Sequence, residues 1–223
     1  MIAAGAHVLF YALAAAASPL ALTATFVAIR SARPRANGIA FLSGFLLGTA
    51  IASGLGLVLG EAAVERLDSH EMLEAVLALL LGIALLTFGL RARHESPGPK
   101  PEGSRASAIL AGLGNVRPAA AFSMAGLLGF GGPKRLVLTF LAMASVSSLG
   151  DVEIGTLVFV YIAVATVLVW VPVGIVIVAG ERAAMILARG QSWLTEHAAA
   201  LRVWLSMGIG AALVVDALVR LLA

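Results

Sequence analysis

Long stretches without a single charged residue constrain this chain more than any other feature. They cover residues 8–29, 36–60, 75–90, 118–133, 136–150, 154–180 and 203–215. Several exceed the ~18 apolar residues that a membrane-spanning helix needs. The composition agrees, because 61% of the residues are hydrophobic and 12% are charged, against roughly 45–50% and 25% in soluble domains. The sequence predicts an all-α membrane protein and argues against a water-soluble globular fold.

We expect six transmembrane helices. They lie near residues 8–29, 38–60, 72–90, 134–149, 154–179 and 203–222. The Gly-rich segment 106–132, before the fourth span, is apolar but too short to cross the membrane and return, so it is predicted to be re-entrant or interfacial. A run rich in Pro, Gly and charge follows the third span and is typical of a flexible loop. The predicted units are a first three-helix repeat (1–92), a linker (93–117) and a second three-helix repeat (118–223).

The basic residues predict the orientation of these spans. Of the 15 Lys and Arg residues, 13 fall in predicted loops on one side, and only Arg66 and Arg220 fall on the other. Since cytoplasmic loops of membrane proteins carry the excess of basic residues, the Pro-rich linker is predicted to be cytoplasmic and both termini to lie outside a cell (plasma or inner) membrane. These loops also account for the basic pI near 10.0, so we expect no nucleic-acid partner.

The two halves share a pattern that predicts a 3+3 inverted repeat. Three pairs match at identical spacing: Pro19 with Pro133, Thr25 with Thr139, and Phe26 with Phe140. A weaker echo pairs Gly82 with Gly210 in the third spans. Because each half has three spans, the second half must enter the membrane from the opposite side, as in transporters with inverted-topology repeats.

Pro19 and Pro133 mark the predicted substrate-binding site. Each proline removes a backbone N–H and breaks a helix inside a span. Broken helices at corresponding places in two halves are the best sequence-level pointer to a transporter site, since half-helix N-termini present free N–H groups to anions. Thr23 and Thr139 lie nearby in the sequence and are added to the candidate substrate-binding residues. The alternative is that both prolines are structural kinks.

Lys134 and Arg135 are also predicted to bind substrate. Two cations at the start of a helix oppose its macrodipole unless an anion is shared, so they are candidates for phosphate, sulfate or carboxylate. The alternative is that they extend to the cytoplasmic headgroups and only set the orientation.

Two further groups of charges have open roles. Arg30, Arg33 and Arg35 form a basic turn that is predicted to collect lipid headgroups, although topology alone explains them equally well. Asp216 is the acid that lies inside a predicted span. It is expected to pair with Arg220 one helical turn away, with a proton or ion relay as the alternative.

Motifs for catalysis are missing from the sequence. It contains no Gly-rich phosphate loop after a strand, no His-Glu-x-x-His, no Gly-x-Ser-x-Gly and no Cys. We therefore expect no enzyme activity, no catalytic residues, no metal site and no cofactor.

Five short segments resemble one family. They are SPLAL (18–22), RPRANGIAFLSGF (33–45), GPKRL (132–136), VPV (171–173) and AGERA (179–183). Their order and spacing are similar to the glycopeptidolipid- and sulfolipid-addressing (GAP/Sap) family of the lysine exporter superfamily. That family usually has Asn-Pro-Lys where this chain has Gly132-Pro133-Lys134. The resemblance implies a protein of the bacterial cell envelope, associated with moving complex glycolipids toward the surface in mycobacteria and their relatives, and it transfers no catalytic residue.

The expected function is export of an anionic or amphiphilic (glyco)lipid toward the cell surface. The alternatives are a small-solute exporter, for amino acids or ions, and a non-transporting scaffold of envelope-lipid export. Expected partners are membrane lipids, larger envelope-lipid transporters and a second copy of the chain.

Overall fold

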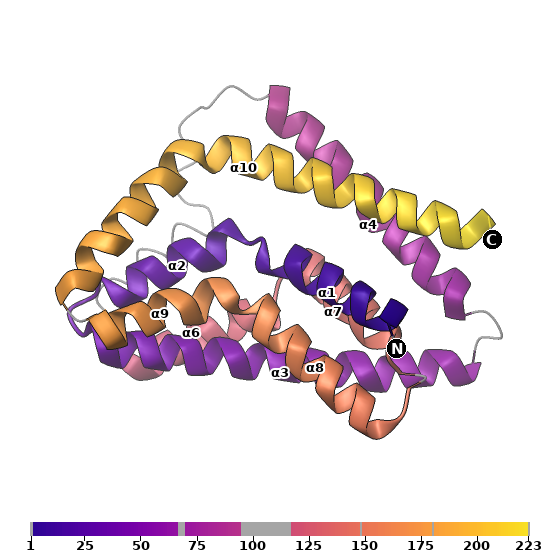
Figure 1. Cartoon of the computed structure of the whole chain (residues 1–223), viewed down its shortest axis with the longest axis horizontal. Coiled ribbons are helices and arrows are strands. Elements are labelled where there is room, and N and C mark those ends of the chain that lie inside the picture. The colour runs from indigo at the N-terminus through magenta and orange to yellow at the C-terminus, as the bar shows by residue number, and fades with distance from the viewer. Residues whose placement is uncertain (1, 67–69, 95–116, 148, 180, 223) are drawn as a thin grey trace.

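The computed structural model describes residues 2–66, 70–94, 117–147, 149–179 and 181–222. Over these ranges the chain is helical, with no strand, which confirms the all-α class (Figure 1). The helices are α1 (Ile2–Ala16), α2 (Pro19–Ile29), α3 (Pro34–Arg66), α4 (His70–His94), α6 (Pro118–Phe130), α7 (Pro133–Ala144), α8 (Asp151–Ala165), α9 (Val167–Ala179) and α10 (Glu181–Leu222). Most of the predicted linker and the start of the predicted re-entrant segment lie outside the described residues.

The membrane-spanning capacity is carried by one straight helix and three bent pairs. The segment Pro34–Gly60 of α3 is long and apolar enough to cross a membrane by itself. The pairs α1–α2, α6–α7 and α8–α9 bend by 60°, 62° and 67°, and each has the length and composition of one broken span or a re-entrant loop. The helices α4 and α10 carry the shorter apolar segments Ala78–Arg91 and Val203–Val219.

Three details differ from the sequence-based expectation. The predicted fourth span, 134–149, is represented by the 12-residue α7, which at about 1.5 Å per residue is too short to cross a ~30 Å hydrocarbon core. It is joined through a bend to α6, which lies in the predicted re-entrant segment. The fifth span bends at Thr166, while Pro172 lies inside α9. Residues 181–202, predicted as loop, are the helical start of α10, because their Ala, Leu, Met, Arg and Glu are strong helix formers.

Helices from the first half of the sequence pack against helices from the second half (Figure 1). The crossing pair α4 and α10 lies along one side of the molecule and α3 along the opposite side, with α1 and α2 between them. α3 packs on α6 and α7, while α1 and α2 pack on α8 and α9. The main core cluster joins both sets through Tyr11, Leu138, Tyr161 and Leu213.

Glycines bring α3 and α6 into backbone contact. A Cβ atom on Gly44 would overlap the carbonyl of Phe122, and one on Gly48 would overlap the carbonyl of Gly126. The Gly-x-x-x-Gly pair of α3 therefore packs within this chain, where the small residues let two helices approach closely.

Gly48→Ala tests this contact. The added methyl forces α3 and α6 apart, so we expect a loss of stability of about 1–3 kcal/mol, measured as thermal unfolding of the purified protein in detergent. Gly54→Ala on the same helix is the matched control, because a Cβ there meets no atom within 4 Å. Equal melting temperatures for the two variants would contradict the packing argument.

Candidate functional site

The break between α1 and α2 removes the helical partner of the Ala15 carbonyl. In an α-helix the carbonyl of residue 15 accepts from the N–H of residue 19, but Pro19 has no N–H. The guanidinium of Arg135 takes that place, since its Nη1 lies 3.4 Å from the Ala15 carbonyl. Ser18 caps the new helix by accepting from the Ala21 N–H at 3.4 Å.

The break between α6 and α7 repeats this arrangement. Pro133 begins α7 and lacks the N–H that would bond the Gly129 carbonyl. The Thr49 hydroxyl lies 3.3 Å from that carbonyl and 2.9 Å from the Phe45 carbonyl, so its single proton serves one of the two. Thr49 also accepts from Arg135 Nη2 at 3.2 Å. A second freed carbonyl is thus linked to the same guanidinium.

The break between α8 and α9 supplies a third connection. The Val169 N–H donates to the Thr166 carbonyl at 2.8 Å and not to the Ala165 carbonyl. The Ala165 carbonyl accepts from Arg135 Nη2 at 3.3 Å. One side chain therefore joins all three bends.

Helix ends neutralise this buried cation. Arg135 is only 8% exposed, and within the described ranges it has no carboxylate partner. Each helix C-terminus carries about −0.5 charge, so α1 and α8, which both end here, offer about as much negative charge as one carboxylate. The Phe45 ring, 4.7 Å from the Arg135 Cζ, adds a cation–π contact. The Nε of Arg135 is buried without a hydrogen-bond partner in the described part of the chain, so one donor stays unused.

Thr139 supports the arginine from the next turn of α7. Its hydroxyl donates to the Arg135 carbonyl at 2.8 Å and lies 2.7 Å from the Tyr161 hydroxyl. Since the Thr139 proton is engaged, Tyr161 is the donor in that second bond. Gly131 has a φ of 105°, which favours glycine, and a Cβ there would lie 2.9 Å from the Arg135 Cβ.

Lys134 differs from its neighbour. It is partly exposed, and no hydrogen bond or ion pair of its side chain occurs among the described residues. Lys134 is therefore a cation at the edge of the site that has no protein partner to give up.

The other predicted headgroup and substrate residues lie apart from Arg135. Arg30, Arg33 and Arg35 are exposed at the turn between α2 and α3, and Thr23 is exposed on α2. The turn itself is held by buried side chains that are uncharged: Asn37 donates to the Ser31 hydroxyl at 2.8 Å, and Ser31 donates to the Ala28 carbonyl at 2.7 Å.

Asp216 pairs across the fold. Its carboxylate lies 3.3 Å from His7 Nε2, which joins α10 to α1. The pairing of Asp216 with Arg220 stays a prediction. The Arg220 side chain lies outside the described part of the structure. No group of three or more His, Asp or Glu that could hold a metal occurs among the described residues.

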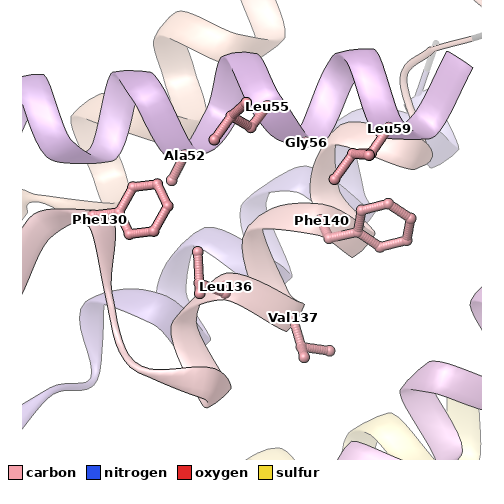
Figure 2. A pocket seen from close by; sticks show the side chains of 8 residues that line it. All are labelled: Ala52, Leu55, Gly56, Leu59, Phe130, Leu136, Val137 and Phe140. Carbon is pink, nitrogen blue, oxygen red and sulfur yellow. The ribbon is translucent and has the colours of Figure 1, made fainter. Parts of the chain in front are cut away.

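An apolar groove of about 410 Å³ opens beside the Arg135 centre (Figure 2). It is lined by Ala52, Leu55, Gly56, Leu59, Phe130, Leu136, Val137 and Phe140. Every lining residue is apolar, and they come from α3, the end of α6 and the start of α7.

Sequence reasoning missed most partners of Arg135. Thr49 shares its apolar stretch with Ser43 and Ser53, and Tyr161 shares its stretch with Thr156 and Thr166, so no sequence signal singled either of them out. The carbonyls of Ala15 and Ala165 had no sequence signal except, for Ala15, a proline four residues later. Which side chain would reach those carbonyls depends on contacts between distant segments.

One known family matches most of the chain. A family model described as Sap, sulfolipid-1-addressing protein, matches residues 8–219. The chain belongs to this family. The match confirms the Sap part of the sequence resemblance. Together with the apolar helices, it indicates a membrane protein linked to lipid addressing. Searches of curated proteins and of solved structures found no significant match to this Sap protein.

Arg135→Met tests the joining role of the guanidinium. The variant leaves two carbonyls and one hydroxyl without their donor, so we expect a loss of about 2–4 kcal/mol and a clear fall in melting temperature in detergent. Lys134→Met is the matched control, with an expected change within about 0.5 kcal/mol. If both variants melt alike, Arg135 does not join the bends.

Proposed function

We propose that this protein is an exporter or translocation factor that moves an anionic, amphiphilic lipid toward the cell surface. The observation that carries the proposal is the pair of adjacent cations at the start of α7. Lys134 has no side-chain partner among the described residues, and Arg135 lies at three helix breaks. The family match supplies the lipid class, since its description names a sulfolipid, whose sulfate is an anion. Catalytic chemistry has no part in this proposal.

The proposed architecture is a six-span inverted repeat, as in the lysine exporter superfamily. In this repeat the bent pair α1–α2 corresponds to α6–α7, and α3 corresponds to α8–α9. The contacts follow the same correspondence, because α1–α2 packs on α8–α9 and α6–α7 packs on α3. Gly82 and Gly210, matched in the sequence, meet each other, since a Cβ on each would lie 3.0 Å and 2.9 Å from the other's carbonyl oxygen. Such reciprocal contact is expected of residues beside a two-fold axis.

The two carbonyls freed by Pro19 and Pro133 are a second observation in favour of the repeat. Pro19 frees the Ala15 carbonyl, and Pro133 frees the Gly129 carbonyl at the same spacing. The first accepts from Arg135, and the second lies 3.3 Å from the Thr49 hydroxyl. Where the second half has Lys134 and Arg135, the first half has Leu20 and Ala21. The cationic site therefore belongs to one half, which suits one headgroup for each protein chain.

In the proposed mechanism the lipid headgroup competes for donors that the helix ends now occupy. Charge-assisted bonds to an anion are roughly twice as strong as bonds to neutral carbonyls. A headgroup that is drawn in by Lys134 and bonds to Arg135 weakens the guanidinium contacts to Ala15 and Ala165. Since those contacts join the bent pairs, their release lets the halves move relative to each other.

The proposed orientation has both termini outside and the Pro-rich linker in the cytoplasm.

Small-solute export would use a polar path enclosed by the spans. The groove beside Arg135 is instead lined by apolar residues, which favours an amphiphile. A scaffold without transport activity predicts that the purified protein moves no lipid and copurifies with larger transporters.

Lys134→Ala is the test of this function. In a strain whose own copy is deleted, we expect the variant to insert normally but to lower the anionic lipid at the cell surface about tenfold, because a charge-assisted bond is lost. Mass spectrometry of surface-extracted lipids provides the measurement. Arg91→Ala, which removes one exposed cation from α4, is the control. Unchanged surface lipid with Lys134→Ala would reject the proposal.

A further inference from the structure

A single stripe of α3 connects the cationic centre to the apolar groove. Phe45, Thr49, Ala52 and Gly56 recur at spacings of four, three and four residues, which places them on one helix face. Phe45 and Thr49 contact the Arg135 guanidinium, and Ala52 and Gly56 line the groove. The groove therefore starts one helical turn from the cation.

The facing wall of the groove begins directly after the two cations. Leu136 and Val137 follow Arg135 on α7, and Val137 lies one turn after Lys134. Figure 2 shows α3 along one side and α7 along the other, with Phe130 and Phe140 at opposite ends. The floor is close-packed at Gly56, where a Cβ would lie 3.0 Å from the Met143 Cγ.

The chemistry of the walls selects the occupant. Ordered water needs polar partners, and a polar ligand buried there would lose its hydrogen bonds. The outer face of α3 continues the apolar surface, since Leu55, Val58 and Leu59 are 48%, 63% and 57% exposed. The groove thus opens toward the bilayer, where the available apolar ligand is an acyl chain. An anionic headgroup on that chain complements the charge of Lys134, for which the described part of the chain supplies no partner.

We propose that the groove between α3 and α7 holds one acyl chain of an anionic lipid whose headgroup contacts Lys134. This deepens the proposed function, on which it rests for the direction of movement but not for binding. At the headgroup end, the bond from Arg135 to Thr49 links the two groove walls.

Photocrosslinking in nanodiscs tests the chain site. The probe is phosphatidylglycerol with a diazirine midway along one acyl chain, diluted in phosphatidylcholine. We expect crosslinks on the α3 and α7 peptides that line the groove, mapped by mass spectrometry. Leu55→Trp and Ala52→Leu fill the groove and lower this yield about tenfold. Leu47→Trp is the matched control, because Leu47 is on the same helix, 49% exposed against 48% for Leu55, and outside the groove.

A second probe tests the headgroup. Phosphatidylcholine with the same diazirine chain is expected to label the groove more weakly, and Lys134→Gln is expected to remove the difference between the two probes. Equal labelling of Leu47→Trp, Leu55→Trp and Ala52→Leu would overturn the chain site, and equal labelling by both probes in the unmodified protein would overturn the anionic headgroup. Thermal unfolding confirms that each variant is folded. Crosslinking without any effect of the groove variants on surface lipid would reject the export function and leave the binding site standing.

Discussion

A buried guanidinium that is neutralised by helix ends holds this structure together. A lone cation in a low-dielectric interior is costly unless it is paired, and Arg135 has no carboxylate to pair with in the described residues. The carbonyls of Ala15 and Ala165, at the ends of α1 and α8, take that role. Because both carbonyls exist as acceptors only where a helix is broken, the bends and the arginine depend on each other.

Prolines set the position of two of the three bends, at Pro19 and Pro133. A proline inside a helix exposes the carbonyl four residues earlier, and such a group is expensive in an apolar interior. The Ala15 carbonyl accepts from Arg135, and the Gly129 carbonyl lies 3.3 Å from the Thr49 hydroxyl, which itself accepts from Arg135. A ligand that draws on the same donors therefore acts on the packing of all three bent pairs at once.

Sequence reasoning predicted the helical class, the membrane setting, the Sap family and the helix breaks at Pro19 and Pro133. It divided the second half wrongly around residue 134, because α6 and α7 are each too short to give a full hydropathy signal and only the bend between them makes one unit. It gave no sign that His7, from the other end of the chain, lies 3.3 Å from Asp216. Local spacing predicts neighbours on one helix and carries no information about another helix.

The sequence by itself determined which groups are left unsatisfied and which are charged. Pro19 and Pro133 each remove a hydrogen bond wherever the helix lies, and Lys134 and Arg135 are cations in any fold. Only the tertiary structure decided that Arg135 turns inward to the helix ends while Lys134 stays partly exposed. It also decided that Ala52 and Leu136, 84 residues apart, line one groove. The physical reason is that a guanidinium donates to whichever carbonyls packing brings within about 3 Å, and packing is set by surfaces far apart in the sequence.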